Sequence, residues 1–262
     1  MTGDRPTLAR QVLRVVQTLD DRMATRTVRL PFGIARLSSD LANVHDLNHV
    51  EMNRPTAAIE LFPRIEALFE DAGLEHRKVT TYAAEVAWTL ASAMYDRGWG
   101  AAPLLYMVND DHVPATVTPL GFGVVDDDTW ATHATAFVAD TEWGRSRTIQ
   151  QQMRARDRRL IERTHVRWVL AQDGSAGCHV YRHGRMAQIE DVHVLSEARG
   201  QGLGHGLMAK ALEVCGDADI VFLVAAADDW PKDWYGRLGF RAVASSWQWL
   251  RQLDPEQPAV TA

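Results

Sequence analysis

An arginine and three glycines stand between a strand-like segment and a helical one, and this combination could bind phosphate. Residues 189–194 predict a strand, and apolar residues recur from Leu203 onward at the spacing of an amphipathic helix. Between them lie Arg199 and glycines at positions 200, 202 and 204. Glycine lets the backbone approach a ligand closely. Free N–H groups at a helix start, with the positive end of the helix dipole, attract anions. The pattern therefore predicts a pyrophosphate site.

The glycine spacing narrows the choice of ligand. A dinucleotide-binding fingerprint, G-x-G-x-x-G, fails because its third glycine would fall on His205 or Leu207. A P-loop fails too, because no Gly-Lys-Ser/Thr follows Gly204 at the required distance. The spacing that fits is Arg-x-x-Gly-x-Gly, formed by Arg199, Gly202 and Gly204. It resembles the acyl-CoA pyrophosphate loop of the GNAT superfamily of N-acyltransferases.

A second segment supports the same resemblance. Residues 234–240, W-Y-G-R-L-G-F, are similar to the Y-x-x-L-G-F ending of the fourth GNAT helix, with Tyr235 in the tyrosine position. Between the two motifs, Asp219–Val224 is an apolar run suited to a buried central strand. The order of elements over residues 186–245 matches the C-terminal core of the superfamily. One departure is Asp228, where many relatives carry asparagine; a carboxylate there would repel a phosphate, so Asp228 is not assigned to the cofactor.

The resemblance implies an N-acetyltransferase in which a primary amine attacks acetyl-CoA directly, with no metal. Tyr235 would then be the general acid at the departing thiolate. Glu190 is the favoured general base, with Asp191 or His193 as runner-up; on a plain strand the two carboxylates would point to opposite faces. The residues implied to bind acetyl-CoA are Val192, His193 and Val194 along the pantetheine arm, and Arg199, Gly200, Gln201, Gly202, Leu203 and Gly204 around the pyrophosphate.

The chain also shows signs of an internal repeat. The Tyr95–Trp99 segment echoes residues 235–240, and residues 76–81 predict a strand before it. In this first copy, residues 53–74 take the place of the pyrophosphate loop and lack an Arg/Gly turn. We therefore expect a degenerate GNAT-like half over residues 1–112, a catalytic domain over residues 113–254 and a loose tail over residues 255–262. Two unrelated helix–turn–strand units remain the alternative, since such units are common.

The fold class expected from this organisation is α/β (α+β), with a GNAT-like mixed, mostly antiparallel sheet flanked by helices. Residues 103–128 would join the two halves and supply the first strand of the second. With 262 residues, 46% of them hydrophobic, the chain can bury a large core. Cys178 and Cys215 are expected to be reduced thiols within it.

Charge and hydropathy exclude several classes of protein. The formal charge of −6 argues against a nucleic-acid partner. No apolar run approaches the roughly 20 residues of a membrane span, and the opening M-T-G-D-R-P does not resemble a signal peptide. A cytoplasmic enzyme is therefore expected, with a homodimer left open.

Two polar segments have competing interpretations. His45 and His49 are four residues apart and could share a helix face around a metal. The apolar residues around them settle no helix period, so a polar patch between the halves is favoured over a zinc site. Arginines at seven positions between 145 and 163 predict a helix with a solvated basic face. Contact of these arginines with an acidic acceptor is the other option.

Two functions from other classes compete with the enzyme. An acyl-CoA sensor or regulatory module would bind the same ligand without transferring anything, but the presence of both Glu190 and Tyr235 disfavours it. A dinucleotide-dependent oxidoreductase ranks last because the glycine spacing fails. The acceptor stays open between a small metabolite, an antibiotic and a protein amine.

Overall fold

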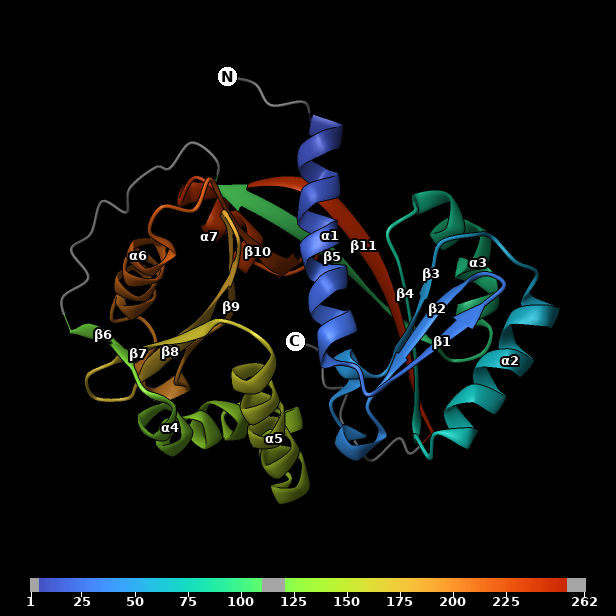
Figure 1. The fold of residues 1–262 in the computed structure, drawn as a ribbon, viewed down its shortest axis with the longest axis horizontal. Coiled ribbons are helices and arrows are strands. Elements are labelled where there is room, and N and C mark those ends of the chain that lie inside the picture. Colours follow the sequence, from blue (N-terminus) through green and yellow to red (C-terminus); the bar gives the residue numbers. More distant parts are fainter. Residues whose placement is uncertain (1–4, 110–120, 254–262) are drawn as a thin grey trace.

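The computed structural model describes residues 5–109 and 121–253, in which two halves lie side by side (Figure 1). The elements of the first half are α1 (Arg5–Met23), β1 (Arg26–Leu30), β2 (Gly33–Leu37), β3 (His49–Met52), α2 (Ala58–Asp71), β4 (His76–Thr81), α3 (Ala84–Tyr95) and β5 (Gly100–Asn109). Those of the second half are β6 (Phe122–Val125), α4 (Asp127–Ala139), α5 (Arg147–Arg163), β7 (Val166–Ala171), β8 (Ala176–His183), β9 (Met186–Val194), α6 (Leu203–Cys215), β10 (Ile220–Ala226), α7 (Pro231–Arg237) and β11 (Arg241–Gln252). The expected tail lies outside the described residues, as does part of the expected connection between the halves.

Eleven strands in the described part of the chain form one continuous sheet. Their order is β1-β2-β3-β4-β11-β5-β10-β9-β8-β7-β6. The pairs β3–β4 and β9–β10 are parallel, and the other neighbouring pairs are antiparallel. The helices lie on both faces, because Phe222 of β10 packs with α1 residues whereas its neighbour Leu223 packs with α6 residues. The expected mixed, mostly antiparallel sheet flanked by helices is confirmed.

The two halves repeat one plan. In each, two antiparallel strands lead to a strand, a helix, a parallel strand, a helix and a last strand: β1-β2-β3-α2-β4-α3-β5 in the first half, and β7-β8-β9-α6-β10-α7-β11 in the second. The strands expected at residues 76–81 and 219–224 appear as β4 and β10. The helical pattern of residues 53–74 corresponds to α2. The expected repeat is thus present in the order of the elements and in their pairing.

The last strand of each half completes the sheet of the other half. β5 of the first half pairs with β10 of the second, from Asn109 opposite Val221 to Leu104 opposite Ala226. β11 of the second half pairs with β4 of the first, and β5 and β11 pair with each other at the centre. Figure 1 shows β11 crossing from α7 to the far end of β4. Neither half therefore closes its sheet with its own strands alone.

The exchange also mixes the hydrophobic cores. Trp249 of β11 is 2% exposed and packs among residues of α2, α3, β3 and β4 in the first half. Met107 of β5 is buried among residues of β8, β9, β10 and α6 in the second half. Burial of such large apolar side chains is a main source of stability, so each half depends on side chains that the other half supplies.

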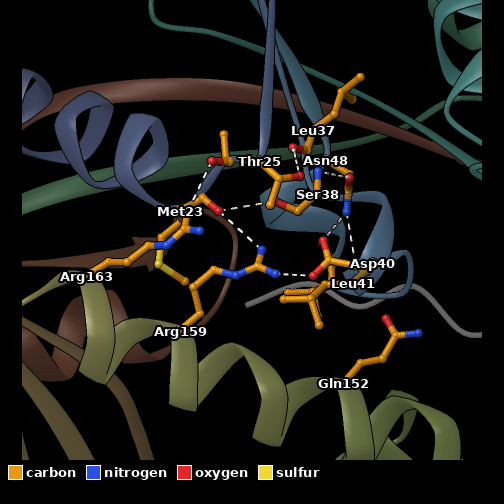
Figure 2. A network of polar contacts seen from close by, with 12 residues as sticks. Met23, Thr25, Leu37, Ser38, Asp40, Leu41, Asn48, Gln152, Arg159 and Arg163 are labelled. Atoms are coloured by element: carbon orange, nitrogen blue, oxygen red, sulfur yellow. Dashed lines mark hydrogen bonds and ion pairs between the residues drawn. The ribbon is translucent and has the colours of Figure 1, made fainter.

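A second contact between the halves joins α1 to α5 (Figure 2). Nη1 of Arg159 donates to the carbonyl of Met23 at 3.3 Å, and Oγ of Ser38 donates to the same carbonyl at 3.2 Å. Arg159 also pairs with Asp40. Nη1 of Arg163 donates to the carbonyls of Arg22 and Ala24 at 2.8 and 3.2 Å. These cations donate to carbonyl groups at the end of α1, where the last carbonyls of a helix lack donors within the helix and the helix dipole favours positive charge.

This contact corrects the expectation of a solvated basic face on α5. Arg154 and Arg158 are exposed as expected. Arg159 and Arg163 instead bind the first half, and Arg156 is largely buried. The arginine pattern predicted the helix but not its contacts with the first half, because the partners of Arg159 and Arg163 are backbone carbonyls and a carboxylate more than 100 residues away in sequence.

The histidine segment is not a single helix. His45 lies in a short 3₁₀ turn, His45–Leu47, and its ring centroid is 4.0 Å from that of His76, with the two rings tilted by 30°. His49 begins β3, with Nδ1 at 2.9 Å from the carbonyl of Asp46 and Nε2 at 3.8 Å from Asp20 of α1. Across the described ranges, no group of three or more His, Cys, Asp or Glu side chains is arranged to hold a metal ion. The segment is a buried polar cluster beneath α1.

Trp249→Ala should destabilise the whole protein by about 3–5 kcal/mol, because it leaves a large cavity in the core of the first half. The side chain that fills this space comes from a strand of the second half. Urea unfolding followed by circular dichroism measures the change. Trp88→Ala is the matched control, since Trp88 is 75% exposed on α3. A loss below about 1 kcal/mol, the size of an ordinary surface effect, would contradict the dependence of the first half on β11.

Candidate active site

β9 and β10 part at the middle of the second half and leave a gap in the sheet. Their parallel pairing runs from Met186 opposite Ile220 to Ile189 opposite Leu223 and ends there. Both strands continue, β9 as far as Val194 and β10 as far as Ala226. Beyond the last pair, β10 remains paired with β5 on its other side. Backbone groups of β9 past Ile189 are thus released from β10, and an extended ligand could pair with them as an added strand does.

A β-bulge distorts β9 at this gap. Between the pair Gly177↔His193 and the pair His179↔Glu190, β9 has one residue more than β8. Asp191 lies in the bulge with a φ of 52°, the only positive φ among the described residues other than glycine. Left-handed backbone is costly for such a residue and is found where a structure holds a side chain in a special position. Bulges of this kind are common next to active sites.

The bulge brings two neighbouring carboxylates to the same face of the sheet. Asp191 pairs with Arg156 of α5 at 2.8 Å. Glu190 accepts a hydrogen bond of 2.7 Å from Gln188, whose cross-strand partner Tyr181 packs against α5. The expectation that the carboxylates would point to opposite faces is therefore wrong, because the extra residue breaks the alternation of a plain strand.

Asp191 belongs to a buried ion network. Nη2 of Arg156 lies 2.8 Å from both Asp191 and Asp157. Asp157 also accepts from Nε1 of Trp130 at 3.1 Å, and Nδ1 of His179 lies 3.5 Å from Asp191. Burial alone would raise the pKa of Asp191, but the Arg156 guanidinium holds it below its ordinary value. A carboxylate held ionised in this way is a weak base.

Glu190 has the opposite electrostatic character. It is half-buried, and no ion pair to a cation is recorded for it among the described residues. Burial, and after it the charge of Asp191, raise the pKa of Glu190 to about 8, although Arg156 acts against this. The first-half carboxylates Asp46 and Asp20 raise it further. A carboxylate with a pKa near neutrality is well suited to accept a proton, and the first half contributes to the field that sets this value.

The glycine turn after β9 has the geometry of an anion site. Gly200 and Gly202 have φ values of 78° and 80°, which other residues adopt only at a cost. A Cβ at either position would meet nothing within 4 Å, so the turn is open toward solvent. Gly202 is the N-cap of α6, a helix of 13 residues. The first N–H groups of a helix have no i−4 carbonyl partner, although that of His205 donates to the carbonyl of Gly202 at 3.1 Å. The turn therefore fits a diphosphate, as the spacing predicted.

Tyr235 approaches the gap from the other side of the sheet. It lies on α7, and its side chain is buried among residues of α6, β8, β9 and β10. Its ring contacts those of Trp234 and Phe240, with centroids 5.0 and 6.1 Å away. Burial raises the pKa of Tyr235 well above its ordinary value. The hydroxyl consequently keeps its proton at neutral pH and can donate it.

Comparison with known families identifies this half. Residues 118–240 match the model of the acetyltransferase (GNAT) family. They form a GNAT acetyltransferase domain. The match covers the gap between β9 and β10, the glycine turn and Tyr235. A search of curated proteins gives no match to the chain.

Solved structures share the fold over both halves. A functionally unknown conserved protein from Staphylococcus epidermidis has a TM-score of 0.72 at 13% identity, covering 86% of this chain and 92% of its own. A GCN5-related N-acetyltransferase from Kribbella flavida has a TM-score of 0.61 at 19% identity, covering 94% and 95%. A tandem GNAT protein from the clavulanic acid biosynthesis pathway has a TM-score of 0.53 at 15% identity, covering 88% and 85%. The first half is therefore GNAT-like in fold, and the expected tandem form is confirmed.

The first half lacks the features that shape the GNAT site. β3 and β4 are paired through Met52 opposite Thr81, the last residue of each strand, so no gap opens between them. The segment before α2 has no glycine, and the N-cap of α2 is Ala57. Among the described residues, this half shows neither the splayed strands nor the open turn of the GNAT domain.

Two of the expected cofactor residues form a polar cluster with Asp140 of the GNAT domain. Nη2 of Arg199 lies 3.1 Å and Nε2 of His193 lies 2.9 Å from Asp140. Asp140 also accepts from the backbone N–H and the hydroxyl of Ser196, at 3.0 and 2.5 Å. Nε of Arg199 donates to the carbonyl of Val194 at 3.0 Å. Arg199 thus links β9 to the end of α4. The anion site at the turn is therefore formed mainly by glycine residues and backbone groups.

Three partners in the site were missed from the sequence. Arg156 was one of seven arginines with no distinguishing spacing. Asp157 did carry a signal, because it falls on the apolar stripe of α5 formed by Ile149, Met153 and Leu160, where a charge must find buried partners. The pairing of Asp140 with His193, Arg199 and Ser196 had no signal in the sequence, since it arises from the fold of α4 against β9.

Glu190→Gln should make the protein more stable than the parent at high pH. The folded carboxyl keeps its proton up to a pKa of about 8, against an ordinary value of 4.5. Between these values the unfolded chain is ionised while the folded one is not, so the parent loses stability as pH rises through this window. The stability difference between variant and parent should grow from pH 5 to pH 9 in urea unfolding. Glu197→Gln, which removes an exposed carboxyl nearby, controls for formal charge; a difference independent of pH would contradict the raised pKa.

Proposed function

We propose that the protein is an N-acetyltransferase that transfers the acetyl group of acetyl-CoA to a primary amine by direct attack. The observation that carries the proposal is the gap between β9 and β10, with the open glycine turn at its end. Proton-transfer groups lie on both sides of the gap, Tyr235 on the α6 and α7 side and Glu190 on the α1 and α5 side. The cofactor would enter from the first side and the acceptor from the second.

The residues proposed for the cofactor fit its parts. The backbone of Val192, His193 and Val194 would pair with the pantetheine arm along the free edge of β9. Backbone N–H groups of residues 200–204 would hold the pyrophosphate at the start of α6, with Arg199 at the base of the turn. When bound, acetyl-CoA would supply the acetyl group as a thioester; the chain supplies position and proton transfer.

The proposed chemistry uses one group on each side of the sheet. Glu190 in its ionised form, which a pKa of about 8 makes the major form only above neutral pH, takes a proton from the attacking amine as the C–N bond forms, directly or through a water molecule. A backbone N–H at the gap in β9 polarises the carbonyl. Tyr235 gives its proton to the sulfur as the C–S bond breaks, and is restored from solvent. Glu190 is preferred over Asp191 because Arg156 holds Asp191 ionised, and over His193 because His193 is paired with Asp140.

The setting proposed for this activity is the cytoplasm, where acetyl-CoA is available. Within the described residues, none of the helices is long and apolar enough to cross a membrane. The division at residues 112 and 113 and a homodimer stay predictions, and the acceptor stays open between a small metabolite, an antibiotic and a protein amine.

Gly202→Ala should weaken acetyl-CoA binding at least about tenfold by calorimetry. The reason is conformational: a φ of 80° is unfavourable for alanine, so the turn would rearrange and misdirect its N–H groups. Gly184→Ala is the matched control, because Gly184 has a φ of 59° in the β8–β9 turn and equally open surroundings. The Gly184→Ala variant should lose about as much free energy of unfolding as the Gly202→Ala variant but bind acetyl-CoA as the parent does. Equal affinity of the Gly202 variant and the parent would refute the turn as the cofactor site.

Tyr235→Phe should lower turnover by about 10²-fold, the low end for general-acid assistance, because a thiolate is a tolerable leaving group. Acetyl-CoA affinity should stay nearly unchanged, since the ring still packs against Trp234 and Phe240. The assay is thiol release with an acceptor found by screening an amine panel. Tyr95→Phe, at the equivalent place in the first half and 60% exposed, is the control. An unchanged rate with chemistry limiting would remove Tyr235 from the mechanism, and binding without turnover on any amine would favour a sensor.

A further inference from the structure

An aromatic cluster stands beside the glycine turn and is not used by the proposed chemistry. Trp234 of α7 lies over the first turn of α6, because a Cβ at Gly204 would meet its indole at 3.2 Å. Its Nε1 donates to Nε2 of His205 at 3.3 Å, and the two rings meet edge to face at 5.6 Å. Trp230, one turn earlier at the start of α7, lies 6.2 Å from Trp234. The cluster therefore extends outward from the turn.

Trp230 is unusual in this cluster because it is 66% exposed. An indole is the largest apolar side chain, and one left in water contributes little to folding. The Trp234 indole is fixed by His205 and by the first turn of α6, so it offers a rigid neighbour for whatever covers Trp230. The open surface of Trp230 is thus continuous with the turn proposed to hold the pyrophosphate.

We infer that Trp230, backed by Trp234, is the stacking surface for the adenine of acyl-CoA. The inference rests on the proposed cofactor site, which would put the nucleoside end of the ligand just beyond the glycine turn. An adenine ring is flat and uncharged and stacks on indole faces with an affinity that alanine substitution readily reveals. The charges around Trp230 fit a neutral ring better than a further phosphate: Asp228 and Asp229 are exposed carboxylates, and Nζ of Lys232 is engaged by the carbonyl of Asp229 at 2.9 Å and lies 3.6 Å from Asp233.

Stacking of adenine on Trp230 would contribute to the affinity for CoA separately from the contacts that the gap between β9 and β10 makes with the pantetheine arm. Trp230 is a positioning residue in this role, because it touches no reacting atom. Its contribution should appear only with ligands that carry the base. A structural role in holding the turn would instead affect every ligand that has a phosphate.

The test compares two ligands on four proteins. Calorimetry with CoA and with 4′-phosphopantetheine, which has the same arm and one phosphate but no adenosine, is carried out on the parent, Trp230→Ala, Trp230→Phe and Trp88→Ala. Trp230→Ala should weaken CoA binding about tenfold, toward the lower end for base stacking, and leave phosphopantetheine within twofold of the parent. Trp230→Phe should lie between parent and alanine variant. Trp88→Ala, which removes an indole 75% exposed on α3, should change neither ligand.

Indole fluorescence provides a second readout. Saturating CoA should quench the parent, and most of that quenching should be lost in Trp230→Ala but kept in Trp88→Ala. CoA binding to Trp230→Ala within twofold of the parent, or an equal loss for both ligands, would overturn the stacking role while leaving the proposed function intact. A parent that binds neither ligand would overturn the proposed cofactor site and the stacking role together.

Discussion

The exchange of two strands at the centre of the sheet is the constraint on which the rest of the structure depends. β11 lies between β4 and β5, and β5 lies between β11 and β10. Because β5 holds the outer edge of β10, β10 can leave β9 without becoming an unpaired strand. The gap in the GNAT domain is therefore supported by a strand from the other half. Buried side chains such as Trp249 and Met107 fix the exchange in the two cores, so the half without an open turn is still required for the shape of the site.

A buried ion network sets the chemistry at that gap. Burying charges is costly unless they are paired, and Arg156 is shared between Asp157 and Asp191. Burial, and after it the charge of Asp191 that this pairing holds in the bulge, raise the pKa of Glu190. Two adjacent carboxylates thereby acquire different protonation behaviour, a pattern that separates structural from proton-transfer roles in active sites. The same network ties α5 to β9, and α5 is in turn tied to α1 of the first half.

The sequence predicted those parts of the structure that a short local pattern of residues specifies. The glycine turn, the strand before it and α6 were predicted because their spacing reflects backbone conformation and helix periodicity. The repeat was visible for the same reason, in the order of elements around Tyr95 and Tyr235. Tyr235 was assigned through the resemblance of residues 234–240 to a GNAT motif. Long-range pairings were not predictable in this way. Nothing in the amino-acid sequence of β11 indicates that it pairs with a strand of the first half, since the residue types of a central strand do not specify which strands lie beside it. The bulge at Asp191 was missed because a single extra residue leaves no period to detect.

The two halves show how one plan can hold or lose a ligand site through small changes. In the first half β3 is only four residues long and stays paired with β4 to its end, so no backbone edge is free. In the second half β9 continues five residues past its last pair with β10, and the bulge turns Asp191 toward Arg156. Glycines at positions of left-handed backbone then open the turn before α6, whereas α2 begins after a segment without glycine. Loss of these features removes the site but not the sheet, and the first half keeps what the GNAT domain needs from it: β5 along β10, and the charges of Asp20 and Asp46 near Glu190.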